Sequence, residues 1–108
     1  MTLAGGNIEA SPEHIVARHE MTITPAEFRR LARHLPGAEA ACIEPLSISS
    51  TDELGRVWKI TLSNLRSRVI GLVRLPVADL EIEMRGYSSS EVERFLDRFY
   101  LVFRKGGG

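Results

Sequence analysis

Residues 56–85 read RVWKITLSNLRSRVIGLVRLPVADLEIEMR, and this stretch decides the fold. Apolar and polar side chains alternate along most of it, which is the period of a half-buried β-sheet. The alternation predicts three antiparallel strands, over 56–63, 68–75 and 79–85. We expect one turn at 63–67, where Asn64 tolerates a left-handed backbone, and a second turn at Pro76. A competing interpretation makes 68–85 a single strand that is kinked at Pro76.

A helix is predicted upstream of this stretch. Thr24 can cap the backbone amide of Glu27, Glu27 can reach back to Thr24, and Pro25 suits the first helical position. Apolar residues then recur at helical spacing. The dipeptide at 36–37, Pro-Gly, ends the pattern.

Two upstream segments are less regular. Ser11-Pro12 resembles a helix start, so we expect a short helix and then an extended piece within 11–23. Residues 43–50 alternate between apolar and polar and predict a short strand. Pro45 cannot donate a backbone hydrogen bond, so this strand is expected at the edge of the sheet.

The C-terminal segment is the clearest helix in the sequence. Ser88 with Glu91 and Ser90 with Glu93 both have capping-box spacing. An apolar stripe follows at helical spacing and consists of Val92, Phe95, Leu96, Phe99, Val102 and Phe103. The cations at 104–105 suit a helix C-terminus.

These elements predict an α+β fold, a four-stranded antiparallel meander flanked by an N-terminal and a C-terminal helix in a two-layer sandwich. The chain of 108 residues suits a single domain, which we place at 11–105, after a mobile N-terminal arm (1–10) and before a flexible glycine tail (106–108). The expected core consists of Phe28, Leu31, Leu35, Trp58, Ile60, Leu62, Val69, Val73, Leu80, Ile82, Met84, Phe95, Leu96 and Phe99.

Composition narrows the function classes. The 14 basic and 14 acidic residues balance, whereas a dedicated nucleic-acid binder usually has a basic excess. The N-terminus lacks the features of a secretory signal, and the longest apolar run, 69–73, is far too short to span a membrane. We therefore expect a cytoplasmic protein without membrane association.

No pattern in the sequence predicts catalysis, a metal site or a bound cofactor. Cys42 is the only cysteine, and most such residues are small buried hydrophobes. A catalytic role would require a base beside it, and the three histidines (14, 19 and 34) are not placed there by the sequence. Their spacing also matches no metal-ligand set.

The C-terminus ends in three glycines. The tail Gly107-Gly108 resembles the Gly-Gly end of ubiquitin-like sulfur carriers, which implies an activated C-terminal carboxylate. The rest of the chain departs from that family, because its tail follows a helix rather than a strand. The resemblance covers two residues, and sulfur carriage is a minor alternative.

The sequence favours a small non-catalytic interaction module, with a second copy or another protein as its partner. Apolar residues of the strands that do not face the core, Ile70 and Leu72 with Val57, are expected on the outer face of the sheet among mixed charge. The candidate interface consists of Val57, Lys59, Ile70, Leu72, Arg74, Glu81 and Glu83. The chain's own N-terminal segment, through Ile15, Val16, Met21 and Ile23, could cover this face instead.

Nucleic-acid binding is the main alternative to protein binding. It would use the basic strand residues Lys59, Arg68 and Arg74, with helix arginines at 29, 30 and 33 as additional contacts. Expected pairing of basic with acidic residues on neighbouring strands counts against it, because paired arginines attract phosphate less strongly.

Overall fold

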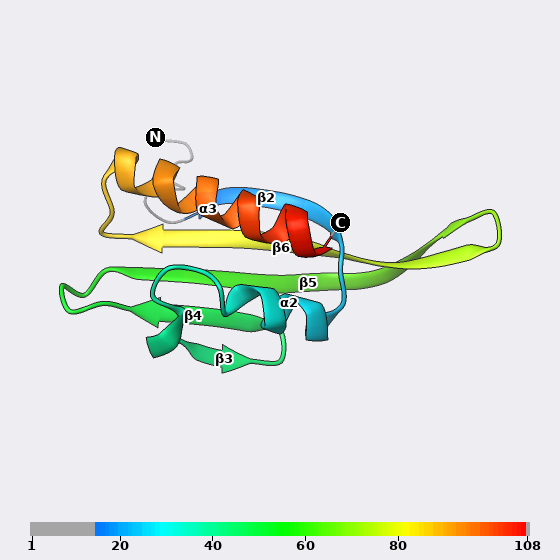
Figure 1. The fold of residues 1–108 in the computed structure, drawn as a ribbon, viewed down its shortest axis with the longest axis horizontal. Coiled ribbons are helices and arrows are strands. Elements are labelled where there is room, and N and C mark those ends of the chain that lie inside the picture. The colour runs from blue at the N-terminus through cyan, green and yellow to red at the C-terminus, as the bar shows by residue number, and fades with distance from the viewer. Residues whose placement is uncertain (1–14, 108) are drawn as a thin grey trace, which may run out of the picture.

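The computed structural model describes residues 15–107 and, within them, the side chains of 16–104. The helix start expected at Ser11-Pro12 and the N-terminal arm at 1–10 lie outside the described residues. Figure 1 shows an antiparallel sheet beside two α-helices. In chain order the elements are β2 (Ile15–Thr22), α2 (Pro25–Ala32), the 3-10 helix η1 (Ala38–Ala40), β3 (Cys42–Glu44), β4 (Ser47–Thr51), β5 (Val57–Ile70), β6 (Val73–Arg85) and α3 (Ser89–Gly107).

The α+β class with an antiparallel sheet and two α-helices is confirmed, but within residues 15–107 the sheet has five strands, in the order β2-β6-β5-β4-β3. The predicted four-stranded meander is wrong at both ends. The short helix expected within 11–23 is wrong from Ile15 onward, because Ile15–Thr22 form the extended strand β2, which pairs with β6 at one edge. The strand expected at 43–50 is two strands, because Pro45 and Leu46 form a turn between β3 and β4.

The largest correction concerns β5 and β6, which are single strands of 14 and 13 residues. They are joined at Gly71-Leu72, and Gly71 has φ +61°, as the first position of a type II′ hairpin requires. Pro76 therefore lies inside β6, and the turn predicted there is wrong. The turn predicted at 63–67 is instead a bulge in β5, where Asn64 has φ +51° and the register shifts.

Both helices begin where their capping residues predict. The Thr24 hydroxyl accepts from the backbone N–H of Glu27 at 3.1 Å, and the Glu27 carboxylate accepts from the backbone N–H of Thr24 at 3.0 Å. Ser88 and Glu91 make the same reciprocal pair before α3, at 3.2 and 2.8 Å. The α-helical part of α2 ends at Ala32, before the Pro-Gly dipeptide.

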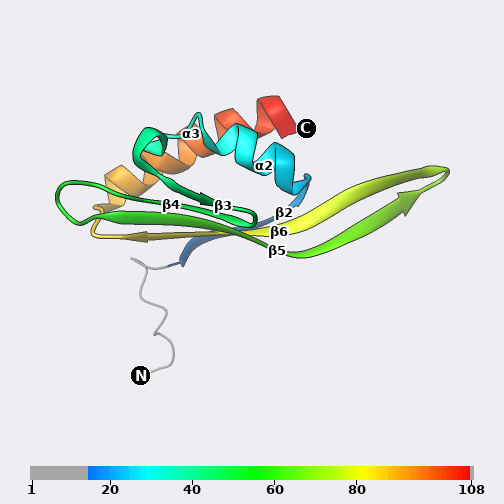
Figure 2. The same cartoon turned by 90° about the horizontal axis from the view of Figure 1, so that it is seen from below.

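Both helices lie on the same side of the sheet (Figure 2), and the core fills the space between. Most predicted core residues are buried: Phe28, Leu31, Leu35, Trp58, Ile60, Leu62, Leu80, Ile82, Met84, Phe95 and Phe99. Leu96 is half-buried at the edge of this cluster. Val69 and Val73 are 59% and 55% exposed, so their predicted burial is wrong.

The reason for that error is visible in Figures 1 and 2. The distal part of the β5–β6 hairpin projects beyond the helices and the other strands, so nothing in the described chain covers it. We call residues 64–76 the arm and the remainder of the described chain the body. The longest dimension of the molecule, 46 Å, runs along this projection.

Candidate functional site

The arm concentrates the exposed apolar side chains of the molecule. Nine large hydrophobic side chains are exposed in the described part of the chain, and five of them lie in the arm: Leu65, Val69, Ile70, Leu72 and Val73. Leu72, at the turn, is fully exposed. Clusters of exposed apolar side chains are typical of surfaces that contact another molecule.

The base of the arm is fixed by charged side chains. Arg66 is paired with Glu20 of β2 and with Asp79 of β6, the latter at 3.1 Å. Arg68 reaches the same Glu20 at 2.9 Å. Asn64 donates to Asp79 at 3.1 Å. These contacts connect the arm to two neighbouring strands and set its direction relative to the body.

The same contacts lower two carboxyl pKa values. The hydrogen bonds from Arg68 and then Arg66 hold the pKa of Glu20 below its usual range. For Asp79 the hydrogen bond from Asn64 has the largest effect, and Arg66 adds to it. Both carboxylates stay ionised at neutral pH, so two of the three arm arginines are already neutralised within the chain.

The tip of the arm has no comparable support. Arg74, its third arginine, has no carboxylate within ion-pair distance in the described chain. Ile70 faces Val73 across the turn, and Val69 faces Arg74. An isolated two-stranded ribbon is only marginally stable in water, so additional contacts would stabilise this segment.

The structure separates the predicted interface residues into two groups. Val57 pairs with Arg85 near the start of β5, and Lys59 pairs with Glu83 beside it. Ile70, Leu72 and Arg74 lie at the tip of the arm. An extended strand spans about 40 Å between residues 57 and 70, so the two groups do not form one patch.

Glu81, the remaining predicted interface residue, lies in the body and forms an ion pair with Arg18 of β2 at 2.8 Å. β2 extends the sheet sideways and does not lie over its outer face. Ile23 is buried, and Val16 and Met21 pack against the core. The part of the N-terminal segment that is described therefore leaves the arm uncovered.

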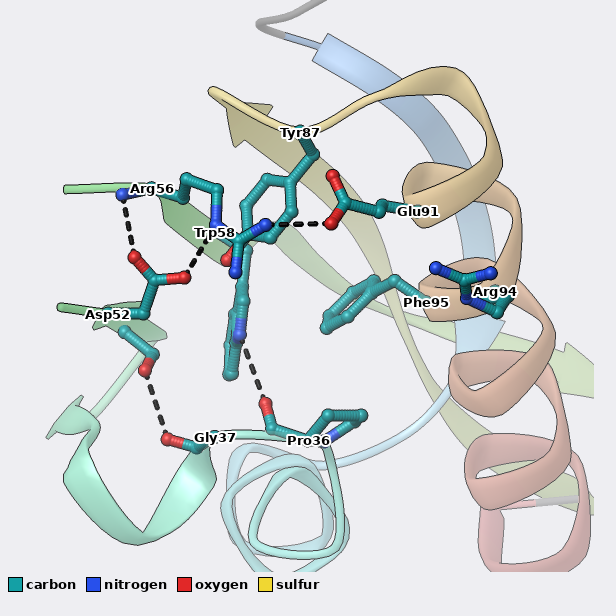
Figure 3. A pocket seen from close by; sticks show the side chains of 10 residues that line it. Pro36, Gly37, Asp52, Arg56, Trp58, Tyr87, Glu91, Arg94 and Phe95 are labelled. Atoms are coloured by element: carbon teal, nitrogen blue, oxygen red, sulfur yellow. Dashed lines mark hydrogen bonds and ion pairs between the residues drawn. The ribbon is translucent and has the colours of Figure 1, made fainter. Parts of the chain in front are cut away.

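The body has a pocket of its own, a cavity of about 350 Å³ at the end opposite the arm. Figure 3 shows its centre, where Arg56 lies between Asp52 and Glu91. The guanidinium donates to Asp52 at 2.6 Å and to Glu91 at 2.7 Å, and it lies 5.1 Å from the centre of the Tyr87 ring. Three aromatic side chains and Arg94 complete the wall: Trp58, Tyr87 and Phe95.

Three of the four charged side chains that line the pocket, Asp52, Arg56 and Glu91, are paired with one another. The pKa of Glu91 is lowered by the backbone N–H of Ser88 and by Arg56. Burial alone would raise the pKa of Asp52, but hydrogen bonds from Arg56 and Leu54 outweigh it and lower the value. The Trp58 indole N–H is also bonded, to the carbonyl of Pro36 at 3.1 Å. This arrangement connects three segments and leaves Arg94 as the only lining charge without an ionic partner in the described chain.

Sequence reasoning missed the pocket and the arm for different reasons. Asp52 and Arg56 are four residues apart in the turn between β4 and β5, whereas Glu91 lies far along the chain in α3. No sequence spacing indicates that Glu91 contacts Arg56. For the arm, a signal was present, because the strand around Ile70 is apolar on both faces. A strand without cover on either side produces the same pattern as a strand with two covered faces.

The basic residues do not form a single patch. Lys59 lies on the body, Arg68 is paired with Glu20, and Arg74 lies at the arm's tip. Arg29 of α2 donates to the carbonyl of Pro45 at 2.9 Å. Lys59, Arg68 and Arg74, the strand residues predicted to bind nucleic acid, therefore do not lie together as free cations in the described part of the chain.

The remaining candidates lie apart from both features. Cys42 is exposed in β3, so the expectation of a buried thiol is wrong. His19 Nε2 is 2.9 Å from the Tyr100 hydroxyl, and His34 is exposed after α2. No three side chains of His, Cys, Asp or Glu gather as a metal site within the described residues. α3 includes Gly106 and Gly107.

The chain was compared with protein-family models, with curated proteins and with solved structures, and none of the three comparisons found a match. Within the described residues, none of the helices has the length and apolar character needed to cross a membrane.

Proposed function

We propose that this chain is a non-catalytic interaction module that self-associates, and that its contact element is the arm. One observation carries the proposal: of the nine large apolar side chains that are exposed among residues 16–104, five lie on one projecting ribbon. The proposal keeps Ile70 and Leu72 of the predicted interface and moves its centre away from Val57.

The body and the arm have different physical characters, which supports this division of roles. The body has its own core, with Phe99, Ile60 and Ile82 fully buried. The arm adds no buried side chain at its tip, where Ile70 and Val73 are more than half exposed. Burial of those side chains against a partner would stabilise the complex by the hydrophobic effect, about 25 cal/mol per Å² of apolar surface.

Sedimentation tests the proposal with matched Leu→Glu variants. We expect the wild type to sediment as a dimer at high micromolar concentration and Leu72→Glu to sediment as a monomer. Leu54→Glu is the control, because Leu54 is also highly exposed but lies in the turn before β5, at the far end from the arm. That variant is expected to remain dimeric. A wild type that stays monomeric throughout would contradict self-association.

Nucleic-acid binding is the outcome that would replace this proposal. The arm contains three arginines and no acidic residue, which is the feature that favours it. Binding through Arg74 and its neighbours would weaken steeply as salt is raised. Retention of the wild type on an oligonucleotide column, abolished by Arg74→Gln but not by Leu72→Glu, would favour it over self-association.

A further inference from the structure

The arm has one blocked edge and one open edge. On the β6 side, the backbone N–H of Ile23 donates to the carbonyl of Pro76 at 3.1 Å, and Pro76 has no N–H of its own. On the β5 side, pairing with β4 ends at Thr61, and the N–H of Leu62 donates to Leu46 at 2.7 Å. Beyond that point no described strand lies beside the edge of β5 that faces away from β6.

The register shows which backbone groups point outward. Ile70 and Val73 close a two-residue turn, and such a pair exchanges its hydrogen bonds within the hairpin. Since hydrogen-bonded pairs alternate with non-hydrogen-bonded pairs, Val69–Arg74 and Ser67–Pro76 direct their N–H and C=O groups away from the hairpin. The outward carbonyl of Pro76 agrees with this pattern.

The two edges therefore differ as templates for strand addition. The β6 edge offers one outward N–H, that of Arg74. The β5 edge offers two, from Ser67 and Val69, together with both of their carbonyl groups. Proline on an edge strand is a known barrier to pairing, and the β5 edge has none.

We propose that two copies of this chain join by antiparallel pairing of the β5 edge of one arm, at Ser67 and Val69, with the same edge of the other. This inference rests on the proposed function, because it specifies how the arms associate. The result is a four-stranded ribbon that continues from one arm to the other.

Three features favour a second copy as the occupant. A strand related to itself by a two-fold axis presents equal numbers of donors and acceptors, so every outward group finds a partner. Arg66 and Arg68 are paired with Glu20 in their own chain, which reduces repulsion between two identical arms. Val69 and Ile70 lie on the paired strand, so pairing brings part of their exposed apolar surface against side chains of the second copy.

A proline substitution tests the edge without removing an apolar side chain. Ser67→Pro deletes one outward N–H in each copy, and we expect dimer affinity to fall by on the order of tenfold or more. Ser67→Ala keeps the N–H and should leave affinity unchanged. Arg74→Pro deletes the outward N–H of the β6 edge and should also leave it unchanged. Near-native thermal unfolding of Ser67→Pro would show that the body remains folded.

Cross-linking gives a second readout. In a Cys42→Ser background, we expect Ser67→Cys, Val69→Cys or a mixture of the two to form a disulfide-linked dimer on mild oxidation. Paired residues of antiparallel strands have Cα atoms about 4.5–5.5 Å apart, within the range that a disulfide spans. Arg74→Cys should not cross-link.

The failure of this inference is distinguishable from failure of the proposed function. A wild type that is monomeric overturns both. Edge pairing alone is overturned if Leu72→Glu disrupts the dimer, Ser67→Pro leaves it intact, and no cysteine at 67 or 69 forms a cross-link. In that case the arms would associate through their faces.

Discussion

The guanidinium of Arg56 donates to the carboxylate of Glu91 at 2.7 Å and so connects the residue before β5 to the first turn of α3. The same guanidinium donates to Asp52 at 2.6 Å, and it lies over the ring of Tyr87. One side chain therefore holds together the β4–β5 turn, the sheet and the start of the C-terminal helix.

Replacing Arg56 by Met should lower the melting temperature, because Asp52 and Glu91 would lose their shared cation while the apolar stem is kept. Arg98→Met on α3 is the matched control, since Arg98 is exposed and makes no ion pair in the described chain. Thermal unfolding followed by circular dichroism measures both. Equal melting temperatures for the two variants would show that the Arg56 contacts contribute no stability.

Stability should fall in acid. The pKa values of Asp52 and Glu91 lie below their ordinary values of 3.8 and 4.5. The unfolded chain therefore takes up protons at higher pH than the folded chain. The free energy of unfolding is retained above the ordinary values and is lost as pH falls through the lower, folded ones.

Urea unfolding between about pH 6 and about pH 2.5 measures this dependence. Arg56→Met should show a shallower decline, because Arg56 contributes to the lowering of both pKa values. An unchanged decline in that variant would assign the pH dependence to other carboxylates, such as Glu20.

Phe99→Ala should destabilise the body by about 3–5 kcal/mol. Phe99 is fully buried, and its ring stacks on that of Phe103 with centroids 4.5 Å apart. Leu101→Ala, two residues further along the same helix, should change the free energy of unfolding by no more than about 0.5 kcal/mol, because Leu101 is half exposed. Similar losses in both variants would contradict the packing of α3 described above.

Gly86→Ala should cost about 1–2 kcal/mol for the left-handed backbone alone, since Gly86 has φ +85°. An added Cβ would also lie 3.0 Å from Cγ of Arg56. Gly55→Ala separates the two effects, because Gly55 has φ +79° but nothing within 4 Å of its Cβ position. We expect Gly86→Ala to be the more destabilising of the two in urea unfolding, and the reverse order would exclude a role for the Arg56 contact.

Cys42 should react with a thiol reagent in the folded protein. Its side chain is exposed in β3, so access does not require unfolding. Modification rates measured in buffer and in denaturant should be comparable at the same pH. Protection that is lost only on denaturation would mean that the residue is covered in solution.

The parts of the fold that depend on local chemistry could be predicted from the sequence. The capping pair of Thr24 and Glu27 and the apolar stripe around Phe99 each specify a helix within a few neighbouring residues. The alternation at Leu80 and Ile82 likewise fixes which face of β6 is buried. These signals require no knowledge of what lies elsewhere in the chain.

The arm could not be predicted in the same way, because its shape depends on where other strands stop. Gly71 lies within an apolar run and resembles the interior of a strand, whereas Pro76 resembles a turn. The sheet tolerates Pro76 because its missing N–H points to an outward edge. The alternation of apolar residues around Val69 predicts a buried face, but Val69 is exposed, so an exposed ribbon can have the same pattern as a covered strand.

The order of the strands along the chain also determines when the sheet of the body can be completed during folding. β2 is the first described strand of the chain, yet it pairs only with β6, where Ile15 lies opposite Glu83. The helix that covers these strands, with Phe99 and Phe103, comes later still. During synthesis β2 therefore remains unpaired until β6 has been made, whereas the β5–β6 hairpin forms between neighbouring residues. Pairing between distant strands, such as β2 with β6, slows folding. β6, at Val73–Arg85, completes a sheet that the first described strand begins.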